Sequence, residues 1–290
     1  MRVATGLMML CAALAAAPAA LAQGARAVVE GVQSPAWVER GAESRPLAPG
    51  TELRAGDRIR TGAGSRVHLK LPEGSSVKLG ENARFEFAEL PPERDSVFRA
   101  ALRVLEGAFR FTTDALSKAR RREVSVSVGT VIAGVRGTDL WGKSMREREI
   151  VCLIEGRVEV AAPNEAPVVL DQPRHFYVRE QGRAQPVGFV EPERLKQWAA
   201  ETELEPGRGA AVRGGAWKLA LARHGTDGAA RAMQAELARS GYAAEVAPVR
   251  QGRYQVYEVR IEGLASRADA EALAARLRGQ HGVAEPQVVE

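Results

Sequence analysis

The sequence predicts a mixed fold, in which an all-β domain over residues 27–190 precedes a small α+β domain over residues 216–290. The first segment consists of short apolar runs with a period of two, separated by glycine, proline and charged residues, which is typical of antiparallel sheets. In the last segment strand-like and helix-like patterns alternate. Residues 205–215, which join the two segments, contain four glycines and one proline. This composition indicates a flexible linker and a domain boundary.

The β-domain is expected to be jelly-roll-like or a stack of antiparallel strands, because its turns are regularly spaced. Glu-Gly pairs recur between apolar runs at residues 73–74, 106–107 and 155–156, and we interpret them as equivalent tight turns. Residues 191–204 predict a short helix with a proline in its first turn and apolar residues on one face. We expect this helix to pack on the end of the β-domain.

The last domain is expected to have the order βαββαβ, with both helices on one face of its sheet. Thr226 and Ser266 are the expected N-caps of the two helices. Ser266 stands three residues before Asp269, which is a variant of the capping box. The other face of the sheet is then open. Alternation along the first and third strands gives the side chains expected on this helix-free face: Lys218, Ala220, Ala222, Tyr254, Val256, Glu258 and Arg260.

Residues 130–140 are unusual, because two glycines, Gly134 and Gly137, bracket Arg136 within apolar sequence, and Thr138 follows. Glycine in a strand marks a bulge, a positive φ or a close backbone approach. Arginine carries five donors, so Arg136 is expected to bind backbone carbonyls or a carboxylate. We interpret the stretch as a structural corner held by a buried arginine. The alternative is a ligand or partner site.

The N-terminus predicts export. Residues 1–22 have the pattern of a signal peptide: Arg2, then an apolar run, then Ala20-Leu21-Ala22 before a mature N-terminus at Gln23. No transmembrane segment is expected after cleavage. Cys152 is then the only cysteine, and it stands in an apolar run, so we expect an inert buried thiol.

Composition and motifs argue against several classes of function. The four histidines are scattered without metal-ligand spacing, and no catalytic constellation is present, so we expect no metal, no cofactor and no enzyme activity. The alternative of an RNA-binding module is disfavoured, since residues 217–290 contain ten basic and nine acidic residues. This balance lacks the excess of positive charge that binds a phosphate backbone. Nucleic acid is therefore not an expected partner.

Three separated motifs in the first domain resemble the FecR-like domain. Ala-Gly-Val-Arg-Gly-Thr-Asp at residues 133–139 is followed by Glu-Gly-Arg-Val at residues 155–158. Upstream stand Gly-Thr-Glu-Leu at residues 50–53, Gly-Asp-Arg-Ile-Arg-Thr-Gly at residues 56–62 and Pro-Glu-Gly-Ser-Ser-Val-Lys-Leu at residues 72–79. The resemblance spans residues 27–190 and implies an elongated β-fold.

Residues 216–289 resemble the SPOR domain in topology and length, with Gly-Tyr-Ala-Ala-Glu-Val at residues 241–246 and Tyr-Glu-Val-Arg-Ile-Glu-Gly at residues 257–263. The resemblance implies a periplasmic module that binds peptidoglycan glycan strands lacking stem peptides. The family has glutamine where Lys218 stands and arginine where Glu258 stands, and it has a glycine near Ala220 and an aromatic residue near Ala222.

Together these features predict an exported, non-enzymatic protein of the periplasm in a Gram-negative-type envelope. Its C-terminal domain is expected to bind glycan strands through Lys218, Tyr254, Glu258 and Arg260. Its FecR-like domain is expected to serve protein interaction or sensing, with another envelope protein as partner. The alternative is a FecR-type regulator of envelope signalling.

Overall fold

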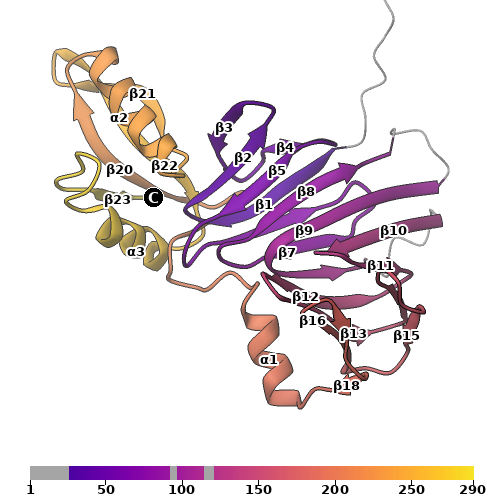
Figure 1. The fold of residues 1–290 in the computed structure, drawn as a ribbon. Coiled ribbons are helices and arrows are strands. Elements are labelled where there is room, and N and C mark those ends of the chain that lie inside the picture. The colour runs from indigo at the N-terminus through magenta and orange to yellow at the C-terminus, as the bar shows by residue number, and fades with distance from the viewer. Residues whose placement is uncertain (1–25, 92–96, 114–120) are drawn as a thin grey trace, which may run out of the picture.

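A computed structural model describes residues 26–91, 97–113 and 121–290. The expected signal peptide over residues 1–22 lies outside the described residues. The described chain is mostly β-sheet and contains three helices (Figure 1).

Two sheets make up the body of the protein (Figure 1). Sheet 1 contains, in pairing order, β4 (Glu52–Leu53), β1 (Ala27–Gln33), β6 (Arg66–Lys70), β7 (Ser76–Leu79), the second half of β9 (Val97–Thr112), β12 (Asp139–Met145), β13 (Arg148–Glu155) and β16 (His175–Glu180), with β17 (Arg183–Ala184) and β18 (Gly188–Phe189) beside β16. Sheet 2 contains β3 (Glu43–Pro46), β2 (Ala36–Arg40), β5 (Arg58–Thr61), β8 (Arg84–Glu89), the first half of β9, β10 (Arg121–Val128), β11 (Val131–Val135), β14 (Val158–Ala161) and β15 (Val168–Leu170).

Strand β9 belongs to both sheets, and Gly107 marks the change from one to the other. Glu106 still pairs with β8 in sheet 2, whereas Gly107 pairs with Ser144 of β12 in sheet 1. Gly107 has φ +88°, and a Cβ there would lie 2.6 Å from the Cα of Ala83. Only glycine fits this bend. The interpretation of residues 106–107 as a tight turn between strands is therefore wrong.

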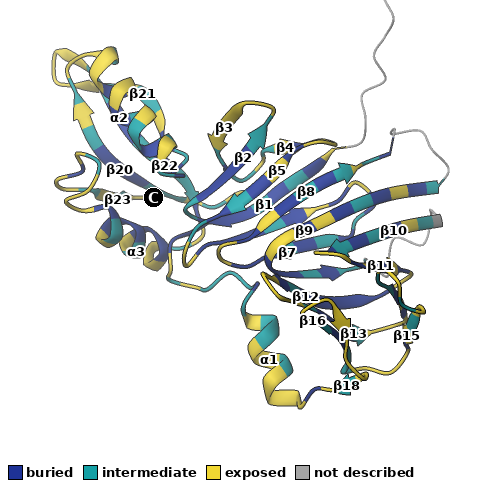
Figure 2. Ribbon diagram, viewed as in Figure 1, coloured by how far each residue is buried: buried dark blue, intermediate teal, exposed yellow. Residues whose placement is uncertain are grey.

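The main core lies between the two sheets. The period-two pattern of the sequence directs one face of each strand inward, as expected for half-buried strands (Figure 2). The largest fully buried side chains of this core are Phe85, Phe87, Phe98, Phe109 and Phe111. A large buried aromatic core of this kind fixes the register of both sheets, because a one-residue slip would expose it.

A second, smaller core covers the outer face of sheet 1. Helix α1 (Pro192–Ala200) lies against this face, where Trp198 stacks on the fully buried Trp141 with ring centroids 4.8 Å apart. We expected the helix on the end of the β-domain; it covers a face instead, because Trp141 and its apolar neighbours point outward from sheet 1. Cys152 is part of this core, and burial raises the pKa of its thiol to about 12. The thiol therefore stays protonated and unreactive at neutral pH.

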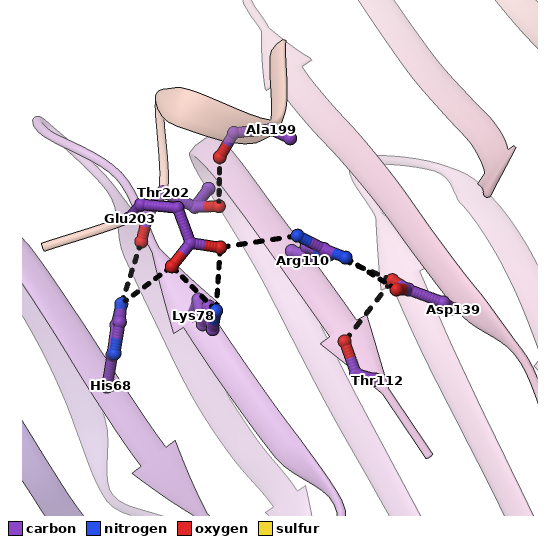
Figure 3. A network of polar contacts seen from close by, with 8 residues as sticks. All are labelled: His68, Lys78, Arg110, Thr112, Asp139, Ala199, Thr202 and Glu203. Atoms are coloured by element: carbon purple, nitrogen blue, oxygen red, sulfur yellow. Dashed lines mark hydrogen bonds and ion pairs between the residues drawn. The ribbon is translucent and has the colours of Figure 1, made fainter. Parts of the chain in front are cut away.

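Residues 201–205, which we call the acidic strap, continue from α1 across the strands of sheet 1. Glu201 pairs with Lys143 of β12 at 2.7 Å, and Glu205 lies 3.5 Å from Arg66 of β6. Between them Glu203 lies 2.6 Å from the Lys78 ammonium and 3.2 Å from the Arg110 guanidinium (Figure 3). The strap thereby places one carboxylate after another on basic side chains of sheet 1.

Glu203 compensates a row of basic residues. His68, Lys78 and Arg110 are direct neighbours on β6, β7 and β9, and like charges at such positions are destabilising. Burial, followed by the nearby Lys78, lowers the pKa of His68, so that its ring stays neutral and its Nε2–H donates to the Thr202 carbonyl (Figure 3). The two cations that remain share the Glu203 carboxylate.

The segment over residues 205–215 differs from the expected flexible linker, because it contains strand β19 (Ala210–Val212). This strand pairs with β1 on one side and, at Ala211, with Leu264 on the other. Asp269 is 2% exposed, and one of its carboxylate oxygens accepts hydrogen bonds from the backbone N–H groups of Arg208, Gly209 and Ala210. The glycine-rich composition reflects the turns that bring these N–H groups together, since Gly207 and Gly209 both have positive φ.

The C-terminal part contains β20 (Trp217–His224), α2 (Asp227–Arg239), β21 (Glu245–Gln251), β22 (Tyr254–Leu264), α3 (Arg267–Leu277) and β23 (Gln287–Val289). Its antiparallel sheet has the order β21, β22, β20, β23. Both helices begin at the expected caps: Thr226 accepts from the N–H of Ala229, and Ser266 from that of Asp269. A separate core lies between this sheet and the helices.

Direct contacts fix the C-terminal part against the body. The indole N–H of Trp37 donates to the carbonyl of Arg239 at the end of α2, and the N–H of Ala36 donates to that of Gly241. Arg276 of α3 donates to the carbonyls of Ser34 and Arg208. Together with β19, these bonds hold the helix-free face in one orientation relative to the two sheets.

Candidate functional site

The helix-free face of the C-terminal sheet is built by the register of β21, β22 and β20. Arg260 of β22 stands between Glu245 and Ala220, and Glu258 stands between Ala247 and Arg223. Val259 and Ile261, which alternate with these residues, are buried in the core under the helices. The charged side chains therefore point to the face that the helices leave open.

A register shift in β20 changes one expected position. The shift lies between Ala220 and Ala222, so that Ala222 stands opposite Val259 and packs against the core on the helix side. The expectation that Ala222 points outward is wrong, because the extra residue of a bulge reverses the alternation beyond it. Arg223 takes the outward position instead, and strict alternation could not have found it.

The charges on this face form a ladder of ion pairs. The Nε of Arg223 donates to one oxygen of Glu258 at 2.9 Å, and a guanidinium nitrogen of Arg260 lies 4.0 Å from the other. Arg260 also pairs with Glu262 at 2.7 Å. Glu258 is only 9% exposed, so its two arginine neighbours hold its position. The Nε of Arg260 is buried and has no hydrogen-bond partner within the described residues.

The structure brings three of the four predicted glycan-binding residues to one region. Glu258 and Arg260 are two residues apart on β22, and Lys218 is half-buried on the neighbouring β20, two residues before Ala220. Tyr254 lies apart: it is 77% exposed at the hairpin between β21 and β22. Six residues of strand separate it from Arg260, or about 20 Å. A ligand that contacts both has to be elongated.

The motif at residues 134–138 differs from its expected role. Arg136 is exposed and makes no ion pair or hydrogen bond within the described part of the chain. The expectation of a buried arginine that binds backbone carbonyls or a carboxylate is therefore wrong. Gly137 has φ +65°, and a positive φ is one of the three conformational reasons expected for a glycine in this stretch. Gly134 lies within β11 with ordinary space around it. Thr138 is buried, and its N–H and carbonyl both bond to Thr113.

The arginine that holds this corner comes from another strand. Arg110 of β9 binds both carboxylate oxygens of Asp139, at 2.9 and 2.6 Å, and this pairing with Asp139 raises the pKa of Arg110 (Figure 3). Asp139 follows Thr138 directly and is 9% exposed. The sequence contained both partners, but 29 residues separate them, and nothing local indicates that they pair.

Gly156 lies in the turn after β13 and packs against Gly137 and Thr138. A Cβ at Gly156 would lie 2.5 Å from the Gly137 carbonyl oxygen and 3.0 Å from the Thr138 side chain. The two motifs at residues 133–139 and 155–158 thus pack on each other through glycine. This close approach to the backbone requires glycine at position 156.

No group of three or more histidine, cysteine or acidic side chains able to hold a metal occurs among residues 26–91, 97–113 and 121–290. Over the same residues no helix combines the length and the apolar character needed to cross a membrane.

Two family models match the chain. The model described as FecR protein matches residues 57–159, and the SPOR domain model matches residues 214–290. The chain therefore carries a FecR domain followed by a C-terminal SPOR domain, as its sequence motifs predict. The SPOR match contains the whole helix-free face described above, and the FecR match contains the corner at Asp139.

The solved structures to which this chain is similar include two crystal structures of a putative anti-sigma factor from Parabacteroides distasonis ATCC 8503. One is 16% identical over 61% of this chain and 73% of its own, and the other 15% identical over 76% and 89%; the TM-score is 0.40 for both. No curated protein matches the chain at a significant level.

Proposed function

We propose that the protein is an exported, non-enzymatic component of the cell envelope that binds peptidoglycan glycan strands through the helix-free face of its SPOR domain. The observation that carries this proposal is the open sheet face itself, with its polar ladder of Arg223, Glu258 and Arg260. A SPOR domain indicates peptidoglycan as the class of ligand. We further propose the periplasm as its location, after cleavage of residues 1–22.

The charge of the face suits an uncharged or weakly charged sugar chain. Three cationic side chains and three carboxylates point to it: Lys218, Arg223, Arg260, Glu245, Glu258 and Glu262. Sugar hydroxyls donate and accept hydrogen bonds, so both kinds of group are useful partners. Because the charges balance, the face offers little attraction to a polyanion, and binding should depend only weakly on salt.

The distance between Tyr254 and Arg260 favours an elongated ligand over a single sugar. An exposed tyrosine offers a flat apolar surface together with a hydroxyl, both suited to a pyranose ring. A glycan strand lying along β22 would contact the ladder at one end and Tyr254 at the other. Stem peptides would add bulk and charge to such a strand, so we propose that the strand lacking them is the better ligand.

The FecR domain is proposed to serve protein interaction or sensing in the same protein. The contacts of Trp37 and Arg276 and the pairing of β19 support a fixed geometry between the two domains. A partner on the FecR domain would then be held at a defined place relative to the cell wall. A second candidate function, regulation of envelope signalling, is favoured by the FecR match over residues 57–159.

Sedimentation with purified sacculi tests the glycan proposal. The mature chain, beginning at Gln23, is mixed with sacculi whose stem peptides an amidase has removed and with untreated sacculi of equal mass. We expect clearly more protein to sediment with the peptide-stripped material. Equal sedimentation, or none with either preparation, would contradict the proposal.

A further inference from the structure

The outer face of sheet 2 contains a trough of about 830 Å³, far from the helix-free face of the SPOR domain. Its floor is a row of small residues across three strands: Ala101 of β9 stands beside Ser125 of β10, which stands beside Gly134 of β11. The next residues in the row are carboxylates, Glu89 on one side and Glu159 on the other. The trough therefore runs across the strands, and an acidic side chain closes each end.

One wall of the trough carries an arginine pair. Val135 pairs with Val158, so Arg136 and Arg157, which adjoin them, stand opposite each other on neighbouring strands. Both are exposed and line the trough, and within the described residues neither has an ion pair or hydrogen bond. Glu123 of β10, which pairs with Arg99 at 3.0 Å, also lines the trough on the side of Arg136 away from Arg157. Arg136 and Arg157 themselves lie side by side, and because like charges at such positions are destabilising, a carboxylate placed between the two guanidinium groups would relieve that cost.

The opposite wall is apolar. Ile132 lies two residues before Gly134 on β11, is 48% exposed and lines the trough. A single exposed isoleucine needs no explanation by itself. Here Ile132 faces the arginine pair across the floor of small residues. The trough therefore offers a charged contact on one side and an apolar contact on the other.

Sheet 1 shows how such a surface is occupied. There the acidic strap follows α1 in turns, with Glu203 on its basic row and the neighbouring Leu204 against Gly31, where a Cβ would lie 2.7 Å from the leucine. Carboxylate and apolar side chain thus reach different contacts from adjacent positions. In an extended segment alternate side chains point to opposite sides, so adjacent residues could reach the two walls of the trough on sheet 2.

We propose that the trough on sheet 2 binds a short extended segment of a partner protein, with one carboxylate between Arg136 and Arg157 and an adjacent apolar side chain on Ile132. The distance from β8 to β14 is about 19 Å, which limits the segment to about five residues. Glu89 and Glu159 disfavour acidic residues at its ends and favour basic ones. This proposal rests on the interaction role proposed for the FecR domain and names the chemistry of the partner.

Binding of a labelled pentapeptide, Lys-Leu-Glu-Leu-Lys-amide, to the mature chain tests the proposal by fluorescence polarisation. The matched peptide has glutamine in place of glutamate. Both peptides are cationic, so attraction by the overall positive charge of the protein does not assist them. We expect the glutamate peptide to bind at least about tenfold more tightly, which is the effect of one charge-assisted contact.

The variant Arg136→Gln/Arg157→Gln should lose this preference, while Arg146→Gln/Arg183→Gln, which removes two exposed arginines elsewhere, should keep it. Neither pair touches the SPOR domain, so sedimentation with peptide-stripped sacculi should be unchanged in both. Equal affinity for the two peptides, no binding of either, or a preference that survives in Arg136→Gln/Arg157→Gln would overturn the trough as a peptide site. Such results would leave glycan binding untouched, because that is measured separately.

Discussion

Replacing Asp269 by alanine is expected to destabilise the protein by at least about 3 kcal/mol, because three backbone N–H groups, two of them buried, lose their acceptor at once. The donors are the backbone amides of Arg208, Gly209 and Ala210, and the Ser266 hydroxyl loses its partner as well. Since these amides adjoin β19, the segment over residues 205–215 should also become sensitive to protease.

Chemical denaturation and limited proteolysis check this expectation, with Glu271→Ala as the control. Glu271 is an exposed carboxylate on the same helix, and its pair with Arg267 is a surface contact worth less than about 1 kcal/mol. If Asp269→Ala were no less stable than Glu271→Ala, the clamp between α3 and the linker would not contribute to the fold.

Arg110→Ala is expected to lower the free energy of unfolding by about 3 kcal/mol, because it leaves the buried Asp139 carboxylate without its cationic partner and with only the Thr112 hydroxyl donating to it. Glu203 loses one of its two cations in the same change. Arg136→Ala should change stability by less than about 0.5 kcal/mol, since that side chain is exposed and unpaired within the described residues. Thermal and denaturant melts of the two variants give the comparison. A larger loss for Arg136→Ala than for Arg110→Ala would mean that the arginine of the motif holds the corner after all.

The contrast between the two arginines shows what the sequence could and could not predict. Glycine at residue 137 was recognisable as a conformational requirement, because positive φ is a local property of the chain. The partner of an arginine is not local. Asp139 was available in the same motif, but β9 and β12 had to pair before Arg110 could reach it.

Asp269 has one role that the sequence predicts and one that it does not. Its spacing from Ser266 identified the helix cap, and the structure contains that cap. The second function of the carboxylate, as acceptor for residues 208–210, depends on where the chain passes before the domain begins. Composition alone made that passage look like a flexible linker, although it contains β19.

At the candidate site, period-two alternation located Glu258 and Arg260 on the helix-free face, because β22 keeps its alternation there. It failed on β20, where the bulge exchanges Ala222 for Arg223 and no residue type announces the shift. The separation of Tyr254 from the charged ladder follows from the strand rise alone, because both lie on the same strand, β22.

The most direct test of the central claim is binding of Lys218→Ala/Arg260→Ala to peptide-stripped sacculi at low and high salt. The matched control is Lys196→Ala/Arg231→Ala, which removes the same charges from exposed helix positions, and thermal melts establish that both variants fold. The unmodified chain and the control should bind equally well at both salt concentrations, whereas binding by Lys218→Ala/Arg260→Ala should be almost abolished, since each contact to a charged group contributes about 1.5–3 kcal/mol. Undiminished binding by the folded Lys218→Ala/Arg260→Ala chain would show that the helix-free face is not where the glycan lies.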